Sequence, residues 1–344
     1  MKPLVTGLER AHALGAPATV GRIRLHVEDF RVDECLGFEP AGSGGHLLVQ
    51  VEKRGLNTVD AAAILARHAG AAPRDVGYSG LKDRHAVSTQ WFTLPFIERV
   101  DWQALPPGIR VLHCERHHRK LKRGSHHGNR FRIRAALDRI DAIDLENRLQ
   151  AVRSGGVPNY FGEQRFGPRF EDNARQLLEG RRLSRLQRGM TLSGIRSDLF
   201  NRVLRCRVLE GCWNTPLPGE FVNLEGTRSG FAACDNDADV ARRIAAMDLH
   251  PTGPLYGRGA NPATGRAASL EDDILSRYEP WCGLLAGAGL KLERRPTRCV
   301  ACDLDWRLDH GEGVLELDFV LRRGQFATSV LREILDYRDV TRPD

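Results

Sequence analysis

The sequence predicts an α+β protein whose strands and helices lie in separate parts of the chain. Residues 20–135 hold most of the segments that alternate apolar and polar side chains, and this pattern returns after residue 302. Helical periodicity dominates the residues between them. The chain has 344 residues, which is long enough for two domains. Gly155 and Gly156 end a predicted helix where the pattern changes, so we expect a domain boundary there.

The first part is predicted to consist mainly of strands. Asn57 and Thr58 can cap an Ala-rich helix over Val59–His68, which Gly70 ends. A second helix is predicted over Asp141–Arg153. The predicted strands are Val20–Val27, Phe30–Leu36, His46–Val51, Val87–Leu94, Ile109–Cys114 and Phe131–Ala135.

The second part is predicted to be mainly helical, with strands near the end of the chain. Pro216–Leu224 is typical of a strand with turns, and the Gly- and Pro-rich stretch His250–Arg266 of a long loop. The strand Val314–Leu321 alternates apolar with mostly charged residues, which predicts a sheet with one wet face. Asp303–Leu308 is a further predicted strand. The predicted helices are Asp172–Leu178, Ile195–Glu210, Asp237–Met247, Glu271–Leu285 and Gln325–Tyr337.

The charge of the chain is mildly basic and clustered. Its 51 Lys and Arg exceed its 44 Asp and Glu, for a formal net charge of +7. The tract Arg116–Arg134 holds eight Lys or Arg and four His but no acid. Such a tract fits the phosphates of RNA, although a solvated face is the usual role of a charge run. No apolar run approaches membrane-spanning length and the N-terminus lacks a signal peptide, so we expect a cytoplasmic protein without membrane contact.

Cysteine spacing and glycine-rich loops give no sign of a metal or cofactor. The eight cysteines are scattered, as is usual for a reduced cytosolic protein. Cys299 and Cys302 have the spacing of a zinc knuckle, but no second pair of ligands follows them. His250–Arg266 has no Gly-Lys-Ser/Thr and is therefore not a phosphate-binding Walker loop. We expect no metal and no organic cofactor.

The stretch Gly77–Leu94, GYSGLKDRHAVSTQWFTL, carries the main candidate for chemistry. Its glycines allow a sharp bend before the predicted strand Val87–Leu94. Asp83 lies on this exposed turn between Lys82 and Arg84, and nearby cations favour the ionised form of a carboxyl group. The alternative is a solvated turn with surface ion pairs.

Three ordered motifs resemble those of the TruD family of tRNA pseudouridine synthases. GLKDRHAVSTQW is similar to the family pattern around its nucleophilic aspartate. Val157–Gly167, VPNYFGEQRFG, is similar to its second signature, and Gln325–Glu333, QFATSVLRE, to its C-terminal one. The family has Leu-Pro before this last turn, where this chain has Arg322-Arg323. The resemblance spans essentially the whole chain.

The resemblance implies a discontinuous pseudouridine synthase catalytic domain, residues 1–154 with 303–344, built on a mixed, largely antiparallel sheet with helices. Residues 155–302 would form an inserted α/β TRUD domain. The implied reaction is the cofactor-free isomerisation of a uridine in tRNA, uridine-13 in the family, to pseudouridine. Asp83 would be the catalytic nucleophile, attacking either C1′ of the ribose or C6 of the base. We expect the enzyme to be a monomer.

The resemblance also implies residues that bind the substrate. Phe30, in an E-D-F-x-V-x-E pattern, Asn129 and Phe131, in an N-x-F motif, and Phe326 would surround the base, and Lys82 or Arg84 could steady the carboxylate. Without the resemblance, Phe30 and Phe131 could be ordinary core residues and Asn129 a turn residue. The residues expected to contact RNA are Arg119, Lys120, Lys122, Arg123, Arg130 and Arg165.

Three other functions are compatible with parts of the sequence. A non-catalytic RNA-binding protein using tract 116–134 needs no acid at position 83, and the intact motif argues against it. An RNA methyltransferase needs a Gly-rich cofactor loop between a strand and a helix, which the sequence lacks. A metal-dependent nuclease needs several convergent carboxylates, and only Asp83 is prominently placed.

Overall fold

The computed structural model describes residues 10–235 and 237–341, which form two compact units. Within the described chain, residues 18–145, 301–324 and 335–341 make up the first, which we call the sheet unit. Residues 10–17, 146–235, 237–300 and 325–334 make up the second, which we call the helical unit. This division follows compactness alone, so the domain boundaries given by the family resemblance stay a prediction.

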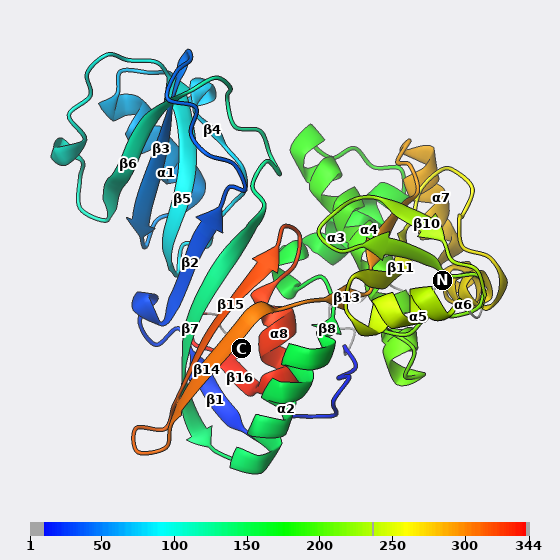
Figure 1. Cartoon of the computed structure of the whole chain (residues 1–344). Helices are drawn as coiled ribbons and strands as arrows, with labels where there is room; N and C mark the ends of the chain where they lie inside the picture. Colours follow the sequence, from blue (N-terminus) through cyan, green and yellow to red (C-terminus); the bar gives the residue numbers. More distant parts are fainter. Residues whose placement is uncertain (1–9, 236, 342–344) are drawn as a thin grey trace. The chain divides into compact units, whose positions relative to one another are not determined.

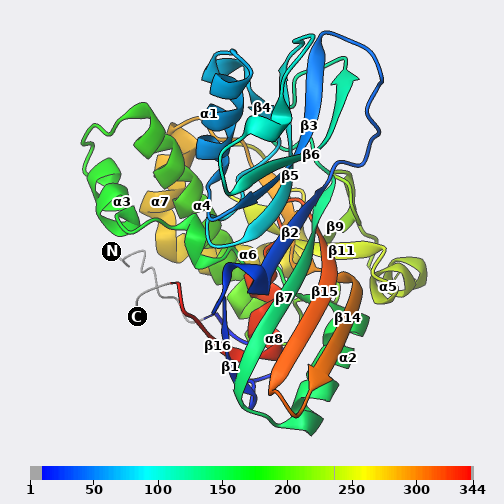
Figure 2. The same ribbon diagram turned by 90° about the vertical axis from the view of Figure 1, so that its left-hand side faces the viewer.

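Ten of the described strands form one sheet in the sheet unit, with its main order β14-β15-β7-β2-β5-β3-β6. β2 pairs parallel with β5, and β1 with β16, while the other pairs are antiparallel. The sheet is therefore mixed and largely antiparallel, as predicted; Figure 2 shows β2, β7, β15 and β14 side by side. The strands are β1 (Val20–Ile23), β2 (Phe30–Cys35), β3 (His46–Arg54), β4 (Gly77–Tyr78), β5 (Val87–Pro95), β6 (Ile109–His117), β7 (Gly128–Arg139), β14 (Cys302–Asp309), β15 (Val314–Arg322) and β16 (Asp336–Asp339).

The register of the sheet separates a buried face from a charged one. Across β7, Phe131 lies between Val32 of β2 and Phe319 of β15, and all three side chains are buried. One residue further along the strands, an ion pair joins Arg132 to Asp33. Because successive side chains of a strand alternate between faces, a predicted wet face on β15 and a buried face beneath it follow from the same register.

α1 (Thr58–His68) lies beside β3 and β5 (Figure 1). Asn57 is its N-cap, as predicted, and its side chain accepts a hydrogen bond from the backbone N–H of Asp60 at 2.9 Å. The helix buries Ala61 and Leu65 against apolar side chains of the strands. α1 follows β3 in the chain and covers the buried side of this part of the sheet. The remaining short elements of the unit are η1 (Val27–Asp29), η2 (Pro73–Asp75) and η3 (Trp102–Ala104).

The helical unit packs its helices around an aromatic core. α4 (Arg185–Leu209) is the long central helix, with α3 and α7 beside it in Figure 1. It begins ten residues before the predicted start at Ile195, because Ser184 and Gln187 form a capping box there. The unit also contains β8 (Val157–Pro158), η4 (Glu163–Arg165), α3 (Phe170–Leu178), β9 (Phe221–Leu224), β10 (Gly230–Ala232), α5 (Ala238–Ala245), β11 (Leu249–Leu255), α6 (Gly265–Leu275), η5 (Ser276–Tyr278), α7 (Glu279–Gly287), β12 (Glu293–Pro296), β13 (Arg298–Cys299) and α8 (Ala327–Ile334). α2 (Ala142–Gly155) runs across the boundary between the units.

Two sequence predictions about this half of the chain are wrong. The start of the predicted loop His250–Arg266 is part of β11, whose first half pairs only with β9 and whose second half pairs only with β12. Pro251 and Pro254 are accommodated because each half has one unpaired side. The predicted helix Gln325–Tyr337 ends early, and β16 follows it because residues Asp336–Asp339 pair with β1.

Candidate active site

Asp83 lies in an irregular segment before β5 that we call the Asp83 loop (residues 79–86). Its Oδ2 accepts a hydrogen bond from Arg24 Nη1 at 2.7 Å, and its Oδ1 accepts one from the backbone N–H of His85 at 3.1 Å. The Asp83 side chain is 26% exposed and that of Arg24 is 4% exposed. Asp83 is therefore a partly buried, ion-paired carboxylate, which corrects the expectation of an exposed turn.

Lys82 and Arg84 do not supply the cation that faces Asp83. Lys82 Nζ is 2.6 Å from Glu34 Oε2, and both of these side chains are buried. Arg84 Nε donates to the carbonyl oxygen of Gly55 at 3.2 Å. The expectation that either neighbour steadies the carboxylate is wrong, because Lys82 pairs with Glu34 and Arg84 bonds to the main chain of Gly55. Their contact with the substrate stays a prediction.

The surroundings of Asp83 favour its ionised form. Burial by itself would raise the pKa of the carboxyl group. The Arg24 guanidinium and the backbone N–H of His85 outweigh burial and hold the pKa below its ordinary value. Asp83 is thus an ionised carboxylate near neutral pH, as the sequence predicted, although its charge partner comes from the end of β1 rather than from the loop itself.

Arg24 connects the carboxylate to an aromatic ring. It directly follows β1 with a left-handed backbone (φ 63°), which is uncommon for a residue with a side chain. Its guanidinium carbon lies 4.1 Å from the centroid of the Phe30 ring, a cation–π contact. Sequence reasoning missed Arg24, which the sequence marks only as one of the basic residues that alternate with apolar ones in the predicted strand Val20–Val27.

Phe30 and Phe131 lie together on the buried face of the sheet. Their ring centroids are 6.1 Å apart in an edge-to-face arrangement, and Phe131 stacks on Phe319 at 5.6 Å. Phe30 is 4% exposed and Phe131 is 8% exposed, so both rings belong to the core. The structure therefore brings Phe30 next to Arg24, and Phe131 next to Phe30.

Asn129 presents a buried acceptor on the same face. It lies in register with Glu34 of β2 and Leu321 of β15. Its Oδ1 is buried, and no donor among residues 10–235 and 237–341 reaches it. A buried carbonyl without a partner costs roughly 1–3 kcal/mol. Such an atom suits a ligand that brings its own N–H group.

The basic tract Arg116–Arg134 divides into two parts that the sequence did not distinguish. On β7, Arg130 forms a bidentate pair with Asp318, Arg132 pairs with Asp33, and Arg134 with Glu312. These carboxylates lie far away in the sequence, so the tract only looks uncompensated when it is read locally. The β7 part of the acid-free tract is thus compensated by distant carboxylates, and RNA contact by Arg130 stays a prediction.

The other part of the tract is the segment between β6 and β7, which we call the basic loop (residues 118–127). Lys120 Nζ donates to the carbonyl oxygen of Arg74 at 2.7 Å, and Arg123 lies over the ring of Tyr78. These contacts are with neutral groups, and no carboxylate among residues 10–235 and 237–341 pairs with either cation. The exposed basic residues of the loop are Arg119, Lys120, Lys122 and Arg123.

The basic loop is attached to the Asp83 loop. The backbone N–H of Gly124 donates to the carbonyl oxygen of Ser79 at 2.7 Å, and the hydroxyls of Ser79 and Ser125 are 3.0 Å apart. His126 lies close by, and burial together with the Lys82 ammonium lowers its pKa to about 4. The exposed cations of the basic loop are therefore attached to the start of the loop that carries the predicted nucleophile.

The second and third sequence motifs meet inside the helical unit. The ring of Phe326 lies 6.0 Å from that of Phe161, and Ser329 Oγ donates to the carbonyl oxygen of Tyr160 at 3.0 Å. Arg165 lies over the Phe161 ring at 5.5 Å, and its Nε donates to Ser197 Oγ at 3.2 Å. Phe326 and Arg165 thus share one aromatic cluster, and their predicted contacts with base and RNA stay predictions.

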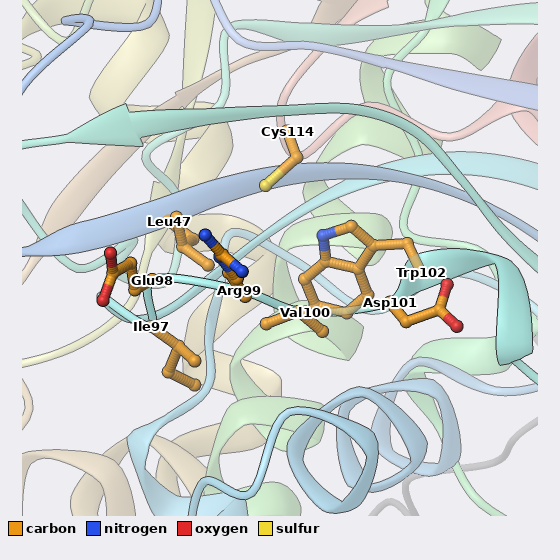
Figure 3. A pocket seen from close by; sticks show the side chains of 8 residues that line it. All are labelled: Leu47, Ile97, Glu98, Arg99, Val100, Asp101, Trp102 and Cys114. Atoms are coloured by element: carbon orange, nitrogen blue, oxygen red, sulfur yellow. The ribbon is translucent and has the colours of Figure 1, made fainter.

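The described surface also has a hollow away from this site. It has a volume of about 490 Å³ and lies between the start of β3 and the segment before η3, with Trp102 and Cys114 on its wall (Figure 3). None of the predicted site residues lines it. Among residues 10–235 and 237–341, no group of three or more metal-ligating side chains is present, and no helix is long and apolar enough to cross a membrane.

Comparisons with known proteins agree over nearly the full chain. The family described as tRNA pseudouridine synthase D (TruD) matches residues 9–175 and 171–334. A tRNA pseudouridine synthase D of Methylococcus capsulatus is 43% identical over 98% of this chain and 96% of its own length. One of Pseudomonas aeruginosa is 43% identical over 95% of this chain and 93% of its own. A crystal structure from Methanosarcina mazei, assigned to the same family, has a TM-score of 0.73 at 19% identity and covers 94% of this chain and 95% of that one.

These matches make the chain an isomerase of the pseudouridine synthase class. It belongs to the tRNA pseudouridine synthase D (TruD) family. The structural likeness independently supports the α+β fold, and the family suggested by the three motifs is confirmed.

Proposed function

We propose that the chain converts a uridine of tRNA, uridine-13 in particular, to pseudouridine with Asp83 as the nucleophile. The observation that carries this proposal is the Asp83 carboxylate, kept ionised by Arg24, whose guanidinium also lies over the ring of Phe30. A side chain of this kind suits covalent catalysis because it is a preformed anion that needs no general base.

The reaction is an isomerisation in which no atom is gained or lost overall. The N1–C1′ glycosidic bond breaks, the uracil turns, and a C5–C1′ bond forms while C5 loses a proton and N1 gains one. Asp83 can assist by bonding transiently to C1′ or to C6, and the two routes stay open. In either route the Arg24 guanidinium balances the carboxylate charge before attack and after release.

Recognition of the base is assigned to the buried face of the sheet. The target uridine has to leave its stack to reach Asp83. The unpartnered Asn129 Oδ1 can accept the N3–H of uracil, and the edges of Phe30 and Phe131 can contact its ring. Contact between Phe326 and the base is a further part of the proposal.

Binding of the tRNA backbone is assigned first to the basic loop. Its exposed cations are uncompensated and adjoin the Asp83 loop, so phosphates near the target nucleotide can bind there. Arg130 and Arg165 would add contacts with RNA. Action in the cytoplasm, as a monomer and without metal or cofactor, completes the proposal.

The test is conversion of an unmodified tRNA transcript by the purified protein. With tritium at C5 of uridine, each turnover releases one tritium to water because C5 loses its hydrogen. We expect release from a transcript with uridine-13 and none from the same transcript with cytidine at that position. Release that is equal for both transcripts would contradict the target, and no release from either would contradict the activity.

A further inference from the structure

Lys53 places a charged side chain against the main chain of the Asp83 loop. It lies in β3 and is 0% exposed. Its Nζ donates to the carbonyl oxygen of Leu56 at 2.6 Å and to that of Asp83 at 3.1 Å, and lies 3.4 Å from Ser88 Oγ. One ammonium group thus ties the segment after β3 to the residue that carries the candidate nucleophile.

Two other buried side chains hold the same loop by its main chain. Thr58 Oγ1 accepts from the backbone N–H of Lys82 at 2.8 Å, and Gln90 Nε2 donates to the carbonyl oxygen of Gly80 at 2.8 Å. The two are joined, because Thr58 Oγ1 donates to Gln90 Oε1 at 3.0 Å. Both are 0% exposed, like Lys53. Of these three anchors, Lys53 is the one that reaches Asp83 itself.

Stability gives no reason for a lysine at position 53. Val49 and Val51 precede it on the same face of β3 and are 0% exposed, so an apolar residue would continue the core. Burying an ammonium costs several kcal/mol unless its donors are satisfied. The three oxygens that Lys53 contacts belong to neutral groups, so no direct ion pair offsets this cost. The position of Asp83 is what the lysine determines.

We propose that Lys53 is a positioning residue for the reaction: its ammonium fixes the main chain of Asp83 so that the carboxylate is held in its attacking position. The inference rests on the proposed function, because Asp83 is taken as the nucleophile. Lys53 is not a catalytic residue in this account, since it contacts neither the carboxylate nor the proposed base pocket. Its loss should therefore affect turnover more than binding.

The charge state of Lys53 allows a second test of the proposal, because it changes with pH. Burial lowers the pKa of Lys53 to about 8; the Asp83 carboxylate opposes this shift and the Lys82 ammonium adds to it. The residues in register with Lys53 on the flanking strands, Ser88 and Ile109, are uncharged, as is Thr58 at the start of α1. A neutral amine has two N–H groups for three acceptors, so its hold on the loop weakens above this pH.

The test compares Lys53→Met with the wild type in single-turnover and steady-state conversion of the tRNA transcript. We expect kcat to fall by about 10- to 100-fold, because small errors in the position of a reacting group cost that much. KM and the Kd for tRNA should stay within about threefold, since binding groups are untouched. A kcat within about twofold of wild type would overturn the proposal.

Val51→Ala is the matched control, because Val51 is equally buried on the same face of β3 but is no anchor of the loop. It should lower the melting temperature and leave kcat unchanged.

Wild-type pH profiles test the proposal even if Lys53→Met does not fold. Between pH 7 and 9, kcat should fall through about pH 8. Over the same range the free energy of unfolding should rise. The folded protein loses the Lys53 proton near pH 8, whereas the unfolded chain keeps it to about pH 10.4, so the unfolded state binds more protons.

These outcomes separate the inference from the proposed function. An inactive wild type would contradict the proposed function. An active wild type whose kcat is flat across pH 8, or an active and folded Lys53→Met, would overturn the role of Lys53 alone. Equal losses of kcat in Lys53→Met and Val51→Ala would show that Lys53 acts through general stability, which also overturns it.

Discussion

Among single residues, Arg24 decides the charge of the candidate nucleophile, because it pairs with Asp83 and lowers the pKa of that carboxyl group. A left-handed backbone costs a residue with a side chain roughly 1–2 kcal/mol, and such strain persists only where surrounding contacts determine it. Here those contacts are the ion pairs to Asp83 at 2.7 Å and to Asp339 at 3.8 Å and the ring of Phe30. The strained residue thus lies where the carboxylate is held, which is the usual place for strain at a functional site.

Replacing Arg24 should move the acid limb of activity. Because Arg24 lowers the pKa of Asp83, the wild-type carboxylate stays ionised below the ordinary pKa of an aspartate. In Arg24→Met the main charge that opposes burial is gone, so the pKa of Asp83 rises. We expect the acid limb of kcat/KM to shift to higher pH, so that the loss of activity relative to the wild type grows as the pH falls. The pH profile of kcat/KM on the tRNA transcript checks this.

Arg24→Lys is the control for charge. A lysine retains a cation within reach of the carboxylate but loses the planar group over Phe30. We expect most of the activity and an acid limb close to that of the wild type. If Arg24→Met shows the same acid limb as the wild type, the ion pair does not set the charge state of Asp83. The same pair also predicts that folding stability falls with pH only as Asp83 becomes protonated, below its ordinary pKa and down through its lowered one.

At the scale of elements, the sequence predicted most strands because their alternation is local. It missed what depends on pairing partners. Arg24 and Asp83 are 59 positions apart, and Arg130 pairs with a carboxylate 188 positions away, so no local pattern reveals either contact. Pro251 and Pro254 argued against a strand in the sequence. They fit in β11 because each half of the strand pairs with one neighbour only.

The division of the basic tract leads to a prediction for RNA binding. No carboxylate in the described part of the chain pairs with the exposed cations of the basic loop, whereas Arg130, Arg132 and Arg134 of β7 have carboxylate partners. Replacing Lys120, Lys122 and Arg123 by Ala should weaken tRNA binding and reduce the slope of log K against log salt by about one unit for each phosphate that the variant no longer binds. Filter binding or fluorescence anisotropy across a salt series measures this.

The control variant is Arg132→Ala combined with Arg134→Ala, two arginines of β7 outside the proposed RNA-binding set. Because their charges are already compensated by Asp33 and Glu312, the salt slope should change little. Equal slopes for wild type and the basic-loop variant would mean that the loop is only a solvated face. A larger change in the β7 variant than in the basic-loop variant would assign RNA binding to β7 instead.

At the scale of the whole molecule, the three sequence motifs lie in two compact units. The Asp83 loop belongs to the sheet unit, and Val157–Gly167 with Phe326 belongs to the helical unit. The family, the α+β class and the mixed sheet could be predicted because the motifs are long and ordered. The grouping of α8 with the helical unit could not, because compactness depends on contacts that no single segment encodes.

Asp83 is the proposed nucleophile, and the Asp83→Asn variant tests this role. The amide keeps the size of the side chain but has neither the negative charge nor the nucleophilic oxygen. Arg24 loses the carboxylate of its 2.7 Å ion pair and keeps that of Asp339 at 3.8 Å. A stability loss of about 1–3 kcal/mol is expected, while folding and tRNA binding within about tenfold of wild type should persist.

The measurement is tritium release from the C5-labelled tRNA transcript by folded Asp83→Asn, with its Kd for tRNA determined in parallel. We expect conversion to fall by several orders of magnitude while tRNA binding remains, because the amide cannot act as the covalent nucleophile. Conversion near the wild-type rate would contradict the account and remove Asp83 from the chemistry. Loss of both folding and binding would make Asp83 a structural partner of Arg24 instead.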